Sequence, residues 1–453
     1  MNKDLGNRIN FGSKFGVVAA AAGSAVGLGN IWKFPYELGQ KGGGAFLLVY
    51  ILCVLLLGLP IMLSEFVIGR RAHLNASGAF RLLTGNNRWS LVGLMGVVGA
   101  FLIVCFYFVV SGWGLEYIYQ AVVDGFEGKT PLDLSLAFSN FTLNTFRPLF
   151  WAAIFMIISS VVLLAGVSQG IERYSKILMP FLVIILVLLS IRSLTMPNSS
   201  EGLKFLFKPD FSKISSSVVL GALGQAFFSL SLGMGCMITY GSYIKKSTNL
   251  FTTALHVTLI DTLIAILAGV AIFPAVFSLG INPAQGPELV FVTLPGVFTQ
   301  MPGGYFFAIL FFLLLAIAAL TSTISLQEVI VAYISEEFHV KRKLVILGLF
   351  PVILVLSILC SLSLAPQSAL QVFDKSLFDL FDYVTSKILM PLGGFFIALF
   401  IGWVYNPNEV RDELSNQGQL RISYYPIYRF LMRYFVPLAI LVIFLRELGW
   451  LSV

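Results

Sequence analysis

The sequence predicts an all-α polytopic membrane protein, that is, a chain that crosses the bilayer many times as helices. Hydrophobic residues make up 58% of the 453 residues and charged residues only 11%, whereas a soluble domain carries about 25% charged residues. Apolar runs long enough to span a bilayer recur along the whole chain. The 29 Lys and Arg outnumber the 22 Asp and Glu, and in a membrane protein this excess indicates topology rather than nucleic-acid binding.

The apolar runs and the polar stretches between them predict eleven spans. These cover residues 12–37, 42–70, 88–122, 148–165, 171–194, 215–244, 248–278, 304–336, 343–364, 376–403 and 425–448. Because the count is odd, the termini are expected on opposite sides of the membrane. Lys and Arg gather in alternate loops, so the positive-inside rule predicts a cytoplasmic N-terminus and an outer C-terminus. The proline-rich segment 279–303 is expected to form a re-entrant or surface hairpin on the outer face.

The first span contains glycines where a membrane helix would be regular. Gly23, Gly27 and Gly29 lie near the middle of the charge-free run 15–32, and glycine lowers helix propensity. A break there leaves backbone groups unpaired, which hydrocarbon tolerates only where they line a protein cavity or bind something. The carbonyls and the Asn30 amide suit Na⁺, and the freed N–H groups suit a carboxylate. The alternative is a kinked or glycine-packed helix interface.

The sixth span has the same interruption. Gly233 and Gly235 follow Ser229 and Ser231 in a charge-free helix. Paired interruptions five spans apart indicate an inverted-repeat transporter with its binding site at the membrane midplane. The eighth span adds a cluster of small and hydroxyl residues at 318–323, for which packing through small residues is the alternative.

These motifs resemble those of the neurotransmitter:sodium symporter family. The run 23–35 with the following 42–46 is similar to the family's first-helix signature, and Glu65, 225–233 and 320–322 match further motifs in the same order. The resemblance extends from Arg8 to the end of the chain. Ending after eleven spans departs from the twelve of the animal members and is similar to certain bacterial members.

The resemblance implies the leucine-transporter fold in a single domain, residues 1–453. In that fold residues 8–194 form the first inverted repeat of five spans, residues 215–403 form the second, and residues 425–448 form an eleventh transmembrane helix. A transporter is therefore expected, and not an enzyme, since no span carries a nucleophile–base pair or a metal cluster.

Two sodium sites are implied by the resemblance. The first would consist of the Ala25 carbonyl, the side chains of Asn30, Ser229 and Asp261, and the substrate carboxylate. The second would consist of the carbonyls of Gly23, Val26 and Ala318 with the hydroxyls of Thr321 and Ser322. Neutral oxygens dominate the second site, which suits a monovalent ion that must also leave.

A substrate pocket is implied in the same way. Its residues would be Leu28, Gly29, Ile103, Tyr107, Phe228, Ser231, Met234, Ser322 and Leu326. The Tyr107 hydroxyl and the Gly29 amide would hold the substrate carboxylate, and Phe228 would close the pocket from outside. Without the family match, Tyr107 would be interpreted as a bundle aromatic whose hydroxyl is already satisfied.

The resemblance also implies two gates. Lys33 and Asp382 occupy the positions of the outer ion pair, where relatives usually have arginine in place of Lys33. Lysine lacks the bidentate fork of arginine, so the closed outer state would be held less tightly. The inner latch would consist of Arg8, Glu336 and Tyr243. For each charge by itself, an ordinary interfacial anchor is the alternative.

A further motif in span five matches the family. Gly170 and Pro180 have the spacing at which local unwinding would admit water to the second sodium site from inside.

Chloride independence is expected from span seven. Asp261 stands where many relatives have a neutral asparagine, and Ala265 where chloride-dependent members have a serine. The register rests on Gly269, and a slip by one residue would place Ile260, which cannot bind a cation, at the site. A fixed carboxylate beside the first sodium would replace chloride, and its protonation after sodium release would give H⁺ antiport.

These expectations combine into one function. The chain is expected to be a sodium-coupled importer of hydrophobic and aromatic amino acids, working by alternating access in the plasma (bacterial inner) membrane. Its expected partners are the amino acid, two co-transported Na⁺ ions and the lipid bilayer, without nucleic acid or an obligate protein partner. The alternative is a non-transporting amino-acid receptor or scaffold on the same fold, and the complete set of ion ligands favours transport.

Overall fold

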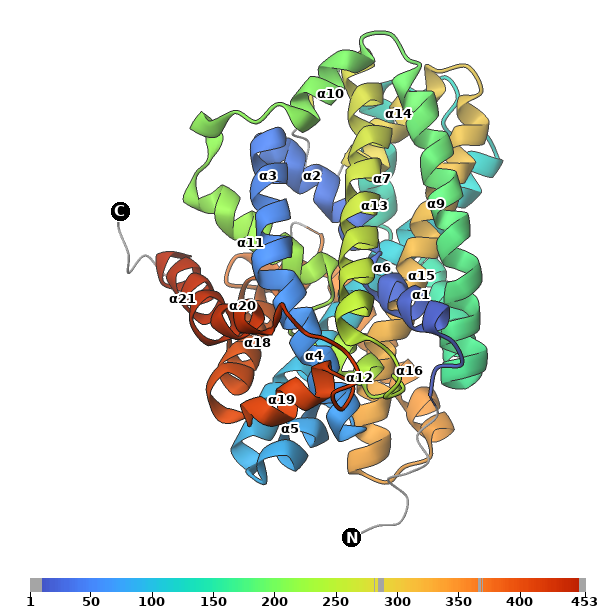
Figure 1. Ribbon diagram of the computed structural model, residues 1–453. Helices are drawn as coiled ribbons and strands as arrows, with labels where there is room; N and C mark the ends of the chain where they lie inside the picture. Colours follow the sequence, from blue (N-terminus) through green and yellow to red (C-terminus); the bar gives the residue numbers. More distant parts are fainter. Residues whose placement is uncertain (1–9, 281, 284–288, 366–367, 369, 448–453) are drawn as a thin grey trace.

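A computed structural model describes residues 10–280, 282–283, 289–365, 368 and 370–447 of the chain. Long helices run side by side through the molecule, with short helices at both ends (Figure 1). In this part of the chain nine helices are long and apolar enough to cross a membrane, and one bent pair makes a tenth. The predicted sixth span is present as two shorter helices, which accounts for the eleventh.

The first half of the chain supplies five of these spans. They are α1 (Lys14–Ala25) with η2 (Gly29–Lys33) and α2 (Phe34–Gln40); α3 (Gly44–Cys53) with η3 (Val54–Gly58) and α4 (Leu59–Ala72); α6 (Asn87–Val122); α8 (Arg147–Leu164); and η4 (Val167–Glu172) with α9 (Arg173–Leu194). The connecting helices are α5 (Ala76–Thr84), α7 (Pro131–Thr142), α10 (Ser199–Phe207) and η5 (Phe211–Lys213).

The second half supplies the other six. They are α11 (Ser216–Ser229) with α12 (Cys236–Gly241); α13 (Leu250–Ser278); α15 (Gly304–Glu337); α16 (Arg342–Leu362); α17 (Leu377–Tyr383) with η7 (Val384–Leu389), α18 (Met390–Leu399) and η8 (Phe400–Val404); and α20 (Tyr425–Phe430) with η9 (Leu431–Phe435) and α21 (Val436–Glu447). The connections hold η6 (Leu289–Thr293), α14 (Leu294–Thr299), α19 (Pro407–Leu414) and a two-stranded antiparallel hairpin, β1 (Gln371–Val372) and β2 (Lys375–Ser376).

Both predicted helix breaks are present, and both are buried. The first lies at residues 26–28, where the helix axis bends by 48° between α1 and the η2–α2 piece. Gly23 remains helical, so the break begins slightly later than the glycine pattern indicates. The second break lies between α11 and α12, where Ser231, Gly233 and Gly235 all have positive φ. Glycine adopts this conformation without a steric penalty, which explains why the break forms at these residues.

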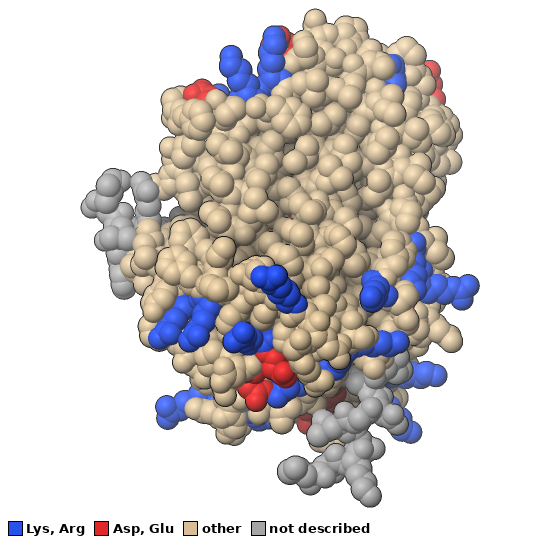
Figure 2. Space-filling view, viewed as in Figure 1, with Lys and Arg blue, Asp and Glu red and all other residues tan. Residues whose placement is uncertain are grey.

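The two broken spans lie in the interior of the bundle. Helix α1 packs against α9, α13 and α15, while α11 packs against α3 and contacts η2. Helices α10 and α14 lie at one end of the molecule and α5 and α19 at the other (Figure 1). In the space-filling view a broad belt between the ends carries almost no charged side chains, and Lys and Arg gather toward the α5–α19 end (Figure 2). The fold thus places two helix breaks at the middle of an apolar belt.

Candidate functional site

A buried carboxylate lies beside the first break. Asp261 of α13 is fully buried. Its Oδ2 accepts a hydrogen bond from the Ser229 hydroxyl at 2.5 Å and one from the Tyr50 hydroxyl at 3.3 Å, and its Oδ1 accepts one from the Asn30 amide at 2.8 Å. Among the described residues no Lys or Arg forms an ion pair with it. A buried charge without a counter-charge is costly, so this cluster fits a small cation.

The side-chain amide of Asn30 faces the same cluster. Its Oδ1 accepts the Gly27 N–H at 3.2 Å, and its amide nitrogen faces Ser229 and Asp261. Which end of the amide faces the carboxylate is assigned from such hydrogen bonds. A rotation by half a turn would present oxygen to the same spot, and a cation there would remove the repulsion between the two oxygens.

A second cluster of oxygens joins α15 to the end of α1. The Thr321 hydroxyl lies 3.0 Å from the Ala318 carbonyl and 3.4 Å from the Val26 carbonyl. The Ser322 hydroxyl lies 3.4 Å from the same Val26 carbonyl and 3.3 Å from that of Ser24. The backbone of Gly23 faces the Thr321 side chain. These oxygens are all neutral, and within the described part of the chain no group of three or more His, Cys, Asp or Glu could hold a metal ion.

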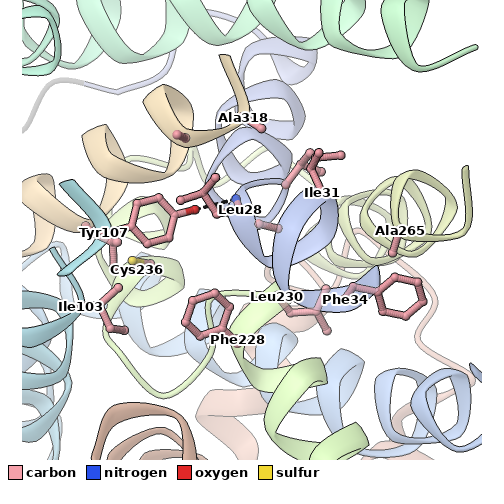
Figure 3. Close-up of a cluster of buried hydrophobic side chains, with 14 of the residues drawn as sticks. Leu28, Ile31, Phe34, Ile103, Tyr107, Phe228, Leu230, Cys236, Ala265 and Ala318 are labelled. Atoms are coloured by element: carbon pink, nitrogen blue, oxygen red, sulfur yellow. Dashed lines mark hydrogen bonds between the residues drawn. The ribbon is translucent and has the colours of Figure 1, made fainter. Parts of the chain in front are cut away.

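A small cavity lies beside the first break. Its lining contains every residue predicted for the substrate pocket except Leu28: Gly29, Ile103, Tyr107, Phe228, Ser231, Met234, Ser322 and Leu326, together with Ser24 and Ala25. Leu28 is fully buried, and its backbone N–H donates to the Tyr107 hydroxyl at 2.7 Å. Figure 3 shows this bond and the rings of Tyr107 and Phe228 beside Ile103. The Tyr107 oxygen is thus held at the break, on the lining of the cavity.

A lysine lies over the Phe228 ring, which is part of the cavity lining. The Lys33 ammonium lies 4.4 Å from the centre of the Phe228 ring, within the range of a cation–π contact. It also pairs with Asp382 at 2.5 Å and bonds the Ser386 hydroxyl at 3.0 Å. The two residues expected as the outer gate therefore meet directly above the aromatic ring that covers the pocket.

The inner-latch residues and their neighbours make contacts that were not expected from the sequence. Arg8 lies outside the described residues. Glu336 accepts hydrogen bonds from the backbone and side-chain nitrogens of Asn75 at 2.6 and 3.1 Å. The Tyr243 hydroxyl donates to Glu328 at 2.7 Å, and Arg342 binds both oxygens of that carboxylate.

Span five is helical along its length and contains a π-helical segment, η4, at Gly170. The η4 and α9 segments form one helix, Val167–Leu194, so the unwinding expected between Gly170 and Pro180 is absent from this conformation. Glu172 instead accepts the Gly12 N–H at 2.7 Å and the Lys176 ammonium at 2.5 Å. The start of α1 is thereby fixed to span five.

Comparisons with known proteins identify the fold and the class of activity. The chain matches the sodium:neurotransmitter symporter family over residues 8–130 and 135–451. The chain belongs to this family. The symporter is 40% identical to the uncharacterized sodium-dependent transporter YhdH of Bacillus subtilis over 98% of both chains. It is 26% identical to the sodium- and chloride-dependent taurine transporter of Bos taurus, over 90% of this chain and 73% of that one.

A solved structure confirms the predicted fold class. The crystal structure of MhsT in complex with L-phenylalanine superimposes with a TM-score of 0.91 and 44% identity, covering 97% of this chain and 99% of that one. MhsT has the leucine-transporter fold, so this symporter has it too. The protein is therefore a sodium-dependent, multi-pass membrane transporter, and its family consists of transporters rather than enzymes.

Several contacts at the symporter's site have no counterpart among the sequence-based expectations. Tyr50 contacts both Asp261 and Ser229, and the Gln225 amide donates at 2.7 Å to the Gly29 carbonyl, which also accepts the Phe34 N–H within the helix. Glu65 accepts the Gly233 N–H of the second break at 2.7 Å. A polar residue inside an apolar span is the signal that could have found them, because such residues are rare without a function.

Proposed function

We propose that the symporter imports hydrophobic and aromatic amino acids together with two sodium ions by alternating access. The observation that carries the proposal is Asp261: a fully buried carboxylate ringed by hydroxyls and an amide, without an ion-pair partner among the described residues. A pocket lies beside the first helix break, and the part of it that would hold the substrate side chain is lined by apolar residues: Ile103, Phe228, Met234 and Leu326. MhsT, which shares the fold, binds L-phenylalanine.

Each end of an amino acid would have a place in this pocket. The substrate carboxylate would accept the Tyr107 hydroxyl proton and complete the first sodium site beside Asn30 and Asp261. Its side chain would lie among the apolar residues, where Met234 can adapt to different shapes. A substrate without a carboxylate would leave the sodium under-coordinated, so amines are expected to be poor substrates.

Relatives that carry biogenic amines have an aspartate at one position of the first helix. The residue at that position here supports amino acids as the substrate class. The corresponding residue is Gly27, and a Cβ added there would lie 2.1 Å from the Ser322 hydroxyl and 2.5 Å from that of Tyr107. This close packing leaves no room for an acidic side chain. The amine of the substrate would therefore meet backbone carbonyls of the broken helices rather than a carboxylate.

Alternating access would use the two sides described above. The Lys33–Asp382 pair closes the outer side, and the inner side opens when α1 separates from Glu172 and its neighbours. The repeats 8–194 and 215–403 would each contribute one broken span to the part that moves, with 425–448 outside them. We place the α5–α19 end in the cytoplasm of the cell, the N-terminus inside and the C-terminus outside, in the plasma (bacterial inner) membrane, because Lys and Arg gather at that end.

Chloride would not be required. Chloride would serve to balance the charge of bound sodium, and here Asp261 carries a fixed negative charge at that place. Ala265, one turn further along α13, is buried and has no hydroxyl with which to bind an anion. On the return step the carboxylate would exchange sodium for a proton, because an isolated charge in mid-membrane is expensive.

Uptake into proteoliposomes tests the proposal. The purified protein is reconstituted, and uptake of a panel of labelled amino acids is measured with an inward Na⁺ gradient and with K⁺ in its place. Phenylalanine, tryptophan, tyrosine and leucine are expected to accumulate only with Na⁺, and dopamine-like amines are expected not to compete. Na⁺-dependent binding without uptake would instead assign the protein to the receptor class.

A further inference from the structure

An arginine with an aromatic cradle lies between the last two spans. The guanidinium carbon of Arg433, in η9, is 4.3 Å from the centre of the Trp403 ring and 5.5 Å from that of Tyr434. The indole N–H of Trp403 donates to the Arg433 carbonyl at 2.8 Å. The ring that supports the guanidinium is thus fixed to the backbone of the same residue, which limits the movement of both.

The positive charge of this arginine is not met within the described protein. In the part of the chain that the structure describes, no carboxylate pairs with Arg433, and its buried Nε has no hydrogen-bond partner. Arg429 lies four positions earlier on the same helical surface, is exposed, and also has no acidic partner there. Two other arginines toward this end are paired, Arg70 with Glu413 and Arg342 with Glu328.

The surroundings of the arginine are those of a lipid-facing surface. Trp403 is 55% exposed, Tyr434 49% and Phe430 58%, and exposed aromatic side chains on a membrane helix face lipid at the level of the headgroups. Trp403 lies one residue before the end of η8, and the next helix is α19, at one end of the molecule (Figure 1). Arg433 thus lies near the membrane surface at that end.

We propose that Arg433, Arg429 and the Trp403 ring bind the phosphate headgroup of an acidic phospholipid in the leaflet at the α19 end. A guanidinium offers parallel N–H donors that match phosphate oxygens. Arg433 as a whole is partly exposed, and the exposed Arg429 adds a second charge. A free phosphate ion would leave the neighbouring aromatic surface bare, whereas the acyl chains of a lipid cover it. The site is separate from the transport pocket and does not depend on what is transported.

Native mass spectrometry of the full-length protein in detergent tests this site. Phosphatidylglycerol and phosphatidylcholine with identical acyl chains are titrated against the wild type, Arg433→Gln and Arg88→Gln. Arg88 is an exposed arginine near the start of α6 that forms no ion pair in the described chain, so its variant matches the loss of charge. The wild type is expected to bind one phosphatidylglycerol about fivefold more tightly than Arg433→Gln does, which is about 1 kcal/mol at 1.4 kcal/mol per tenfold. Arg88→Gln is expected to match the wild type.

Three results would overturn the proposal. The first is equal binding of the two lipids by the wild type. This result needs no variant, so it decides the question even if Arg433→Gln does not fold. The second is an equal loss of phosphatidylglycerol binding in Arg88→Gln, which would show that binding depends only on the net charge of the protein. Displacement of the lipid by millimolar inorganic phosphate would assign the site to the free anion. Trp403→Leu, which removes the ring but no charge, is expected to weaken phosphatidylglycerol binding as well.

Discussion

At the scale of single residues, a glycine decides what the pocket can hold. Gly27 is packed so closely that a methyl group would displace the Ser322 hydroxyl, a proposed ligand of the second sodium. Gly27→Ala is therefore expected to lower the apparent Na⁺ affinity of uptake by about tenfold, the effect of about 1.4 kcal/mol. Gly348→Ala, at a helical glycine with open space around it, is the matched control and should leave uptake unchanged. Wild-type Na⁺ affinity in Gly27→Ala would show that Ser322 does not bind the ion.

A second residue, Asp261, is expected to make chloride unnecessary. Uptake by the wild type should be the same in chloride and in gluconate, because the carboxylate supplies the negative charge beside the first sodium. Asp261→Asn removes that charge and keeps the shape, so it should lose Na⁺ affinity or gain chloride dependence. The measurement is initial uptake rate against Na⁺ concentration in the two anions. The idea is refuted if the wild type itself depends strongly on chloride.

At the scale of elements, α15 brings two adjacent hydroxyls to the end of α1. Thr321→Ala with Ser322→Ala removes both side-chain oxygens of the second cluster, so Na⁺-driven uptake should fall to background while the protein still inserts and folds. Thr323→Ala is the control on the same helix, since its hydroxyl bonds the Leu320 carbonyl instead. Uptake of labelled phenylalanine and a thermal melt separate transport from folding. Retained uptake with unchanged Na⁺ affinity in the double variant would rule out this cluster as an ion site.

The elements themselves were predictable to different degrees. The spans follow from the lengths of apolar runs, and both breaks were found because glycines interrupt charge-free helices. The pairing of Glu328 with Arg342 and Tyr243 was not found, because these residues come from two helices, α15 and α16, and from the turn after α12. Hydropathy shows that a charge lies in a span, but only helix packing shows which charge it meets.

At the scale of the whole molecule, the distribution of Lys and Arg sets the expected orientation. Lys208, which follows α10, and Arg411 of α19 are both exposed and lie toward opposite ends of the molecule. With the α19 end in the cytoplasm, Lys208→Cys in intact cells should react with a membrane-impermeant maleimide, and Arg411→Cys should react only after permeabilisation. The four native cysteines are buried, so the wild type provides the unlabelled background. Labelling in the reverse order would invert the proposed topology.

The sequence by itself determined the class of protein, the approximate positions of the spans, the two breaks and the family. These properties are encoded locally, in hydrophobic length, glycine position and short motifs. Only the tertiary structure decided which groups meet: Tyr50 at Asp261, Gln225 at the Gly29 carbonyl, and Lys33 above Phe228. Such contacts join residues far apart in the chain, and they depend on the angles at which the helices pack. A pattern along one helix does not contain those angles.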